Sequence, residues 1–268
     1  MARRDAGRHV RPPIRLRSQG PPREAERLGS VVVKPRSVVF IVCSPHQRSG
    51  VTTTATLLAE YFAWRGVDAE CFDTDPYQSG FAKRFPQQTQ VTDITTIQGQ
   101  ISLFDKLLVF NERPRIVDVW NRSFQKFFTI LQETGFVAEA RRLSIELVLI
   151  YCADELPASL VTAKQLAILW PNMTTIVAAN EGAAEINEDM GAFLSRFPAQ
   201  LSLHIRPLDP PVTRAINKDT FSYANFIKDP PLDMSIIVRS ALRKWLVHVF
   251  TQLQRFELRN VMSTTEYL

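Results

Sequence analysis

The residues with the clearest chemical potential in this 268-residue chain lie in a loop that follows an apolar run. The loop SPHQRSGVTTT (44–54) comes after VVFIVC (38–43) and leads into a helical pattern. A helix N-terminus presents free backbone N–H groups and the positive end of the helix dipole, so this loop is a candidate phosphate site. Thr52 and Thr53 carry hydroxyls where a P-loop places its magnesium ligand.

Carboxylates accompany the next two apolar runs. Asp73 and Asp75 come directly after AECF (69–72), and Asp118 lies in RIVDV (115–119). A buried carboxylate without a partner is costly, so acids at strand ends indicate a facing cation, water or metal ion. An acid at the end of an apolar strand, such as Asp118, is typical of the carboxylate that faces magnesium in a phosphoryl-transfer site. Structural roles stay open as well: a turn for the first two aspartates, a strand-end cap for Asp118 and a helix cap for the threonines.

The apolar runs also predict the fold. Six of them read as buried strands: 38–43, 69–72, 115–119, 146–152, 174–180 and 201–205. Helical patterns cover 52–65, 121–134, 157–170 and 188–197. This alternation predicts right-handed crossovers and a three-layer α/β/α fold with a mostly parallel, doubly wound sheet. Ligands of such sheets bind beyond the carboxyl ends of the strands, where the loops described above meet.

The segment GVTTTATLLAEYFAWRGVDAECFDTDP (50–76) resembles the start of the ParA/MinD-type partition and positioning ATPases, a branch of the P-loop NTPases. That family reads KGGVGKTT, then a helix, then a strand ending in DxDPQ, and the spacing from Gly50 to Asp73 fits it without a gap. RIVDV resembles the Walker B strand of the family. TTIVAAN resembles its strand ending in an adenine-reading asparagine, here Asn180, and HIRPLDPPVTRAI (204–216) resembles its proline-bearing loop beside the base.

The resemblance implies a P-loop NTPase-like fold with a site for ATP or ADP and Mg²⁺. The implied nucleotide-binding residues are His46, Gln47, Arg48, Ser49, Gly50, Val51, Thr52, Thr53, Asn180 and Pro207. The implied metal-side residues are Thr52, Asp73, Asp75 and Asp118, of which Asp73 and Asp118 would be catalytic.

The loop departs from the family pattern at its charged positions. The P-loop lysine falls on Val51, the second, signature lysine falls on His46, and two glycines become Gln47 and Arg48. Valine has no donor for a β- or γ-phosphate, and side chains at 47 and 48 crowd backbone that should approach the phosphates. Two outcomes remain open. Either His46 or Arg48 substitutes electrostatically, with weak binding and slow hydrolysis, or the site is inactive and the fold is a scaffold.

The net charge of +5 resides at the N-terminal end of the chain. Residues 1–28 hold eight arginines and three carboxylates, and the remaining residues have 24 basic and 24 acidic side chains. Residues 1–36 are rich in arginine and proline and are predicted to be a disordered tail. Such a tail either attracts DNA, RNA or an anionic membrane face, or serves only as a solvated extension. We expect residues 37–256 to form a single domain and 257–268 a short C-terminal tail.

Composition narrows the class of protein. Hydrophobic residues make up 45% and charged residues 22%, as in ordinary globular proteins, and no apolar run reaches the ~20 residues of a membrane span. The cysteines Cys43, Cys71 and Cys152 form no CxxC pair, which favours small buried side chains in a reducing cytosol. A last helix is predicted over 233–256, with one apolar face. His204 and His248 lie in apolar segments and are interpreted as satisfied core or boundary residues, without a ligand role.

By resemblance, the chain is expected to be a cytoplasmic, nucleotide-dependent switch or scaffold that dimerises face to face around nucleotide. It would act with a protein partner in positioning, partition or transfer of DNA or another cargo, with weak or no ATP hydrolysis. One alternative is a non-enzymatic adaptor of a secretion, conjugation or polysaccharide-export machine. Another is a nucleic-acid-binding protein driven by its arginine tail.

Overall fold

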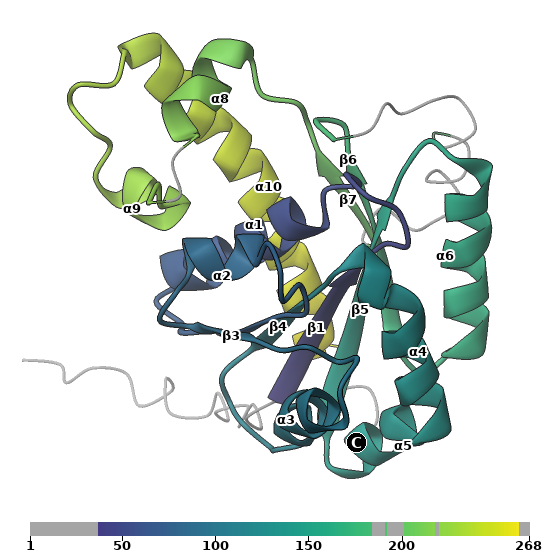
Figure 1. Cartoon of the computed structure of the whole chain (residues 1–268). Helices are drawn as coiled ribbons and strands as arrows, with labels where there is room; N and C mark the ends of the chain where they lie inside the picture. The colour runs from purple at the N-terminus through teal and green to yellow at the C-terminus, as the bar shows by residue number, and fades with distance from the viewer. Residues whose placement is uncertain (1–36, 184–190, 192–200, 218–219, 263–268) are drawn as a thin grey trace, which may run out of the picture. The chain divides into compact units, whose positions relative to one another are not determined.

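The described part of the chain is built on one parallel sheet (Figure 1). The computed structural model describes residues 37–183, 191, 201–217 and 220–262, all within one compact unit, Pro35–Leu268. Seven strands run in parallel within these residues, in the order β3-β2-β4-β1-β5-β6-β7. They are β1 (Ser37–Cys43), β2 (Glu70–Asp73), β3 (Thr89–Val91), β4 (Arg115–Val119), β5 (Ile145–Ala153), β6 (Thr174–Asn180) and β7 (Ser202–Ile205).

Helices cover both faces of the sheet (Figure 1). One face packs against α1 (Val51–Trp64), α2 (Gly80–Arg84), α8 (Pro210–Ile216), α9 (Tyr223–Lys228) and α10 (Ile236–Met262). The other face packs against α3 (Ile97–Leu107), α4 (Phe124–Glu133), α5 (Phe136–Arg142) and α6 (Pro157–Leu169), and the 3₁₀ turn η1 (Asn121–Ser123) precedes α4. Right-handed crossovers explain this division, since connections that move toward β3 and those that move toward β7 must lie on opposite faces. The three-layer, doubly wound fold expected from the sequence is confirmed.

The central strand β1 shows why its sequence is apolar throughout. Val39, Ile41 and Cys43 point into the core beneath α3–α6, whereas Phe40 and Val42 point into the core beneath α1 and α10. Successive side chains of a strand face opposite sides, so a strand buried on both faces needs a continuous apolar run. β1 pairs with β4 on one side and β5 on the other.

The six predicted strands are present, and each of their ends lies within one residue of the prediction. The pattern over 121–134 divides into η1 and α4, and α10 begins at Ile236 and continues to Met262, six residues into the segment assigned to a C-terminal tail. The pattern over 188–197 lies outside the described residues apart from residue 191. The elements β3, α2, α3, α5, α8 and α9 were not expected from the sequence.

The three cysteines are free and fully buried in the sheet, as the sequence predicts. Burial raises the pKa of the Cys71 thiol to about 12, which keeps it protonated. Within the described residues, none of the helices has the length and apolar character that crossing a bilayer requires.

Candidate functional site

The candidate site lies at the carboxyl ends of the central strands. The loop after β1 turns to the α1 face, whereas the loops after β4 and β5 turn to the opposite face, so the connections diverge around β1. A cleft of about 680 Å³ opens at this place, as expected for a topological switch point. We call it the strand-end cleft; it is lined by residues 46–53, Asp73, Asp75, Gln78, Gly80, residues 118–122, Gly182 and Ala183.

The loop between β1 and α1 is held by its own hydrogen bonds. The Ser49 hydroxyl donates to the His46 carbonyl oxygen (3.1 Å), and the His46 N–H donates to the Ser44 hydroxyl (3.4 Å). Arg48 has φ +60° and Gly50 has φ +86°, so two residues adopt the left-handed conformation. That conformation is strained for a non-glycine residue such as Arg48, whose side chain is exposed.

Helix α1 begins at this loop with an open N-terminus. Gly50 is its N-cap residue, no side chain caps it, and its first turn holds no acidic residue. Thr52 and Thr53 are exposed and line the strand-end cleft. The first turn therefore presents free N–H groups and the positive end of a 14-residue helix to the cleft. This arrangement can bind an oxyanion.

Asn180 packs directly against Gly50. A Cβ atom at position 50 would lie 2.2 Å from Asn180 Nδ2, so only glycine fits there. Asn180 Oδ1 accepts a hydrogen bond from the Gly182 N–H (3.1 Å), and the residue is 5% exposed. Pro207 lies beside Gly182, since a Cβ built on that glycine would be 3.6 Å from Pro207 Cα. Asn180 thus supports the loop between β1 and α1, which the sequence predicts to lie next to a nucleotide.

Asp118 and Thr52 meet at the floor of the cleft. Asp118 is paired with Val42 of β1 and Asp73 of β2, and it is buried. Burial raises the pKa of Asp118 to about 8, and the nearby charges of Asp73 and Asp75 act in the same direction. A hydrogen bond with the Thr52 side chain opposes this shift. The carboxyl group is therefore mostly protonated at neutral pH unless a cation compensates its charge.

Asp73 is engaged by the backbone of the segment that follows it. Its Oδ1 accepts from the Asp75 N–H (2.9 Å), and its Oδ2 accepts from the N–H groups of Phe81 (3.1 Å) and Ala82 (3.2 Å). Burial raises the Asp73 pKa, and these backbone hydrogen bonds act against that shift. The geometry agrees with the turn and cap role that the sequence left open.

Asp75 forms a turn in the same segment. Its Oδ1 accepts from the N–H groups of Tyr77 and Gln78, both at 3.0 Å. The bond from the N–H two residues on, that of Tyr77, makes this an Asx turn. Neither Asp73 nor Asp75 therefore has both oxygens free for a ligand, although both line the cleft.

A side-chain contact that sequence reasoning missed fixes His46. Its Nδ1 lies 2.6 Å from Oδ2 of Asp154, which directly follows β5 and is buried. Asp154 Oδ1 also accepts from the Leu156 N–H (3.0 Å). The pair joins residues 108 positions apart, and no local pattern signals it. His46 is thereby tied to the wall of the cleft.

A second missed feature is an aromatic and cationic rim. The Tyr77 and Trp120 ring centroids lie 5.6 Å apart, and the Arg122 guanidinium lies 5.2 Å from the Trp120 centroid. Trp120 and Arg122 line the cleft, and Tyr77 is 79% exposed. Arg122 therefore adds a positive charge to the cleft.

Two of the four expected metal-side residues fit a magnesium ion. Thr52 and Asp118 bring a hydroxyl and a carboxyl oxygen together, the hard ligands that Mg²⁺ uses alongside phosphate oxygens and water. Asp73 and Asp75 fit less well, because both oxygens of Asp73 and Oδ1 of Asp75 already accept backbone hydrogen bonds. In the part of the chain that the structure covers, no group of three or more His, Cys, Asp or Glu side chains is arranged to hold a metal ion.

No family model matches the chain, and no curated protein matches it.

Proposed function

We propose that this protein is a ParA/MinD-like nucleotide-binding switch or scaffold that hydrolyses ATP weakly or not at all. It would act in the positioning, partition or transfer of DNA or another cargo. The observation that carries the proposal is the uncapped N-terminus of α1, which opens into a cleft of about 680 Å³ beside Thr52 and Asp118.

The phosphate groups would lie at the first turn of α1. The N–H groups of that turn and the helix dipole favour an anion there, and Arg48 and Arg122 add positive charge at the rim. This set of donors replaces part of what a P-loop lysine supplies, since Val51 has none. Affinity for the nucleotide is therefore expected to be modest.

A magnesium ion would be held by Thr52 and Asp118. When bound with nucleotide, it supplies charge neutralisation between phosphate oxygens. Asp118 would then ionise, because a neighbouring cation favours the charged carboxylate despite its burial. Pro207 and Gly182 would face the base at the rim, with the buried Asn180 behind them.

Hydrolysis is expected to be slow for two reasons. Phosphoryl transfer depends on positive charge placed against the transferring group, and residue 51 offers no ammonium group. Asp73 and Asp75 are the residues that would orient water, and their oxygens accept hydrogen bonds from backbone amides of residues 75–82. The site is thus better suited to binding than to turnover.

Calorimetric titration of the full chain with ATP and MgCl₂ tests the binding proposal. We expect saturable heat, and we expect Thr52→Ala to weaken the magnesium-dependent part of binding by about tenfold because a ligand oxygen is lost. Thr251→Ala is the matched control, since this exposed threonine of α10 bonds only its own helix, through the Val247 carbonyl. The absence of heat with both ATP and ADP at millimolar concentration would refute the proposal.

A non-enzymatic adaptor is the second candidate function. It is favoured because several polar side chains of the cleft already have partners within the protein. Asp73 and Asp75 accept hydrogen bonds from nearby backbone, and His46 pairs with Asp154. In that case the protein would contact a secretion, conjugation or export machine through its surface. Partner assembly that stays unchanged in Thr52→Ala, with no nucleotide bound, supports this candidate.

Partners and location follow the same proposal. Face-to-face homodimerisation around nucleotide, a protein partner on the cargo and a cytoplasmic location are implied by the ParA/MinD resemblance. The arginine tail, residues 1–36, lies outside the described residues, and its contact with DNA or an anionic surface stays a prediction. Deleting residues 1–28 should reduce the salt dependence of DNA binding if the tail makes the phosphate contacts.

A further inference from the structure

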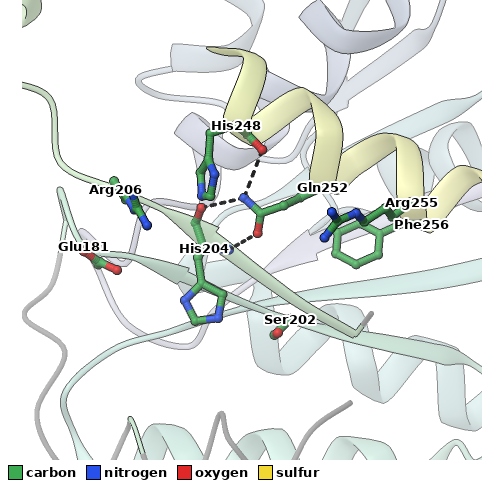
Figure 2. A pocket seen from close by; sticks show the side chains of 8 residues that line it. All are labelled: Glu181, Ser202, His204, Arg206, His248, Gln252, Arg255 and Phe256. Atoms are coloured by element: carbon green, nitrogen blue, oxygen red, sulfur yellow. Dashed lines mark hydrogen bonds between the residues drawn. The ribbon is translucent and has the colours of Figure 1, made fainter. Parts of the chain in front are cut away.

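A second pocket lies at the far edge of the sheet, between β7 and α10 (Figure 2). Its volume is about 330 Å³, near the lower end for small-molecule sites, and its lining includes Glu181, His204, Arg206, His248 and Arg255. None of these residues lines the strand-end cleft. The pocket is therefore separate from the proposed nucleotide site, and the inference below does not depend on that function.

Gln252 of α10 fixes the framework of this pocket. Its Oε1 accepts from the His204 N–H and its Nε2 donates to the His204 carbonyl oxygen, both at 2.9 Å, as the dashed lines in Figure 2 show. Nε2 also donates to the His248 carbonyl oxygen (3.3 Å). One side chain thus pairs with the outer backbone groups of the edge strand and ties it to the helix. The side chains around it project from a fixed backbone.

The side chains of the pocket carry unbalanced positive charge. Two arginines, Arg206 and Arg255, and two histidines, His204 and His248, line the pocket together with a single carboxylate, Glu181. Across the described residues, neither arginine has a carboxylate within salt-bridge distance, and the buried His248 Nε2 atom has no hydrogen-bond partner. A pocket with free guanidinium and imidazole donors and so little negative charge favours an anion.

The charges around His248 also favour a bound anion. Burial lowers its pKa, and the positive charges of Arg206, His204 and Arg255 lower it further, whereas Glu181 raises it. At neutral pH the imidazole is therefore mostly neutral. A bound dianion would oppose these cations and favour the imidazolium form. Anion binding would then be coupled to proton uptake at His248.

We propose that this pocket binds a small oxydianion, such as the phosphate group of a phosphate monoester, through Arg206, Arg255 and His248. Guanidinium groups match the geometry of phosphate oxygens, and the pocket size suits a compact ligand. Phe256 adds an apolar wall for the body of the ligand. Because protonation of His248 adds a donor and a charge, binding is tighter at lower pH.

The test follows the histidine signals by NMR in the full chain labelled with ¹⁵N-histidine, which has only four histidines. Sodium sulfate is the first probe because it stays dianionic while the protein titrates, and sodium chloride at equal ionic strength is the reference. We expect saturable shifts of the His248 and His204 signals, and a rise in the His248 pKa when sulfate is bound. Inorganic phosphate and a phosphate monoester, added next, distinguish a site for the free ion from one that also contacts the ligand body.

Variants that are expected to change the sulfate affinity in opposite directions make the test more specific. Arg206→Gln and Arg255→Gln should each weaken sulfate binding by about tenfold, as loss of a charge-assisted contact predicts. Glu181→Gln should tighten binding because it removes the repelling carboxylate, and damage to folding cannot produce that result. Lys244→Gln is the charge-matched control, since this exposed lysine of α10 does not line the pocket.

Two results would overturn the proposal. One is the absence of a saturable His248 shift up to about 20 mM sulfate, beyond the range of weak specific affinity. The other is an equal response in Arg206→Gln, Arg255→Gln and Lys244→Gln, which would indicate general screening of charge in place of a site.

Discussion

Gly50 and Asn180 are in contact so close that the loop before α1 and the end of β6 form one packed unit. A Cβ atom at position 50 would meet Asn180 Nδ2 at 2.2 Å and Asn180 Cγ at 2.9 Å. Gly50 also has φ +86°, a conformation that side chains disfavour. The glycine that carries the resemblance to a phosphate loop is thus required by the fold as well.

Gly50→Ala is therefore expected to destabilise the protein twice, through backbone strain and through the clash with Asn180. We expect a loss of about 3 kcal/mol in the free energy of unfolding, measured by urea denaturation. Gly66→Ala is the matched control, because Gly66 has φ +75° and no atom within 4 Å of a built Cβ. It should lose only about 1 kcal/mol. Equal losses in both variants would show that the contact with Asn180 is unimportant.

Asp118 should make the stability depend on pH. Its pKa is about 8 in the folded protein and about 4 in an unfolded chain. Between these values the folded state holds a proton that the unfolded state has lost, so the free energy of unfolding falls as pH rises from about 4 to about 8. The contribution is constant below and above this window.

Asp118→Asn removes this ionisation while it keeps the shape of the side chain. Compared with the native protein, the variant should gain relative stability steadily as pH rises through the same window, measured by denaturation at several pH values. Added magnesium and nucleotide should reduce the difference if they bind the ionised form. A stability difference that does not change with pH would contradict a raised Asp118 pKa.

Replacing Asp73 distinguishes a structural role of this residue from a catalytic one. Its oxygens accept from the N–H groups of Asp75, Phe81 and Ala82, so Asp73→Ala leaves three amides without this acceptor. We expect a loss of about 2 kcal/mol in the free energy of unfolding. Asp105→Ala, at an exposed position of α3, should change little. A stable Asp73→Ala protein that no longer binds nucleotide would instead assign the residue to the ligand.

Arg115 should be among the residues that stabilise the fold most. It is fully buried at the start of β4, and its Nη1 donates to the carbonyl oxygens of Lys106 (2.8 Å), Leu107 (2.9 Å) and Val109 (2.6 Å). Its Nη2 donates to the Ser37 hydroxyl. The guanidinium thereby satisfies the carboxyl end of α3. Arg115→Met should cost about 3 kcal/mol, because buried carbonyl groups lose their donor.

Arg142→Met is the control for this variant. Arg142 is exposed and pairs with Glu139 on the same helix at 2.6 Å, so its loss should leave the denaturation midpoint nearly unchanged. If both arginine variants behave alike, the buried hydrogen bonds of Arg115 do not contribute as described.

The sequence predicts the central strands well because a strand that is buried on both faces needs apolar side chains at nearly every position. β1 from Val38 onward and β5 from Leu147 onward are continuous apolar runs, as burial on both faces requires. β3 has only three residues, TQV, so its pattern is too short to recognise. α8 begins with Pro210 and Pro211, which suggested a loop although proline is favoured in the first turn of a helix.

The sequence predicts which residues lie together at the site, but it does not predict where their side chains point. Parallel pairing brings Asp73 and Asp118 to neighbouring positions, as strand order and spacing suggest. Whether a carboxylate faces a ligand or its own backbone depends on a few hydrogen bonds, and Asp73 and Asp75 use theirs in the turn. The His46–Asp154 pair joins residues 108 positions apart and is a tertiary contact that no local pattern encodes.

His204 and His248 lie at the boundary of the core, as the sequence allows, but His248 is not satisfied as expected. Both are partly exposed and line the pocket beside α10, and the His248 Nε2 atom has no partner among the described residues. An apolar sequence neighbourhood reflects the buried faces of β7 and α10. It does not reveal that these two side chains lie at the edge where the elements meet.

Hydrogen–deuterium exchange of the full chain, with and without ATP and MgCl₂, tests the central claim most directly. If the open N-terminus of α1 binds the phosphate groups, backbone amides at about residues 48–54 should become protected, together with those near Asp118. Unchanged exchange in these segments at saturating nucleotide, or protection confined to β7 and α10, would contradict the account.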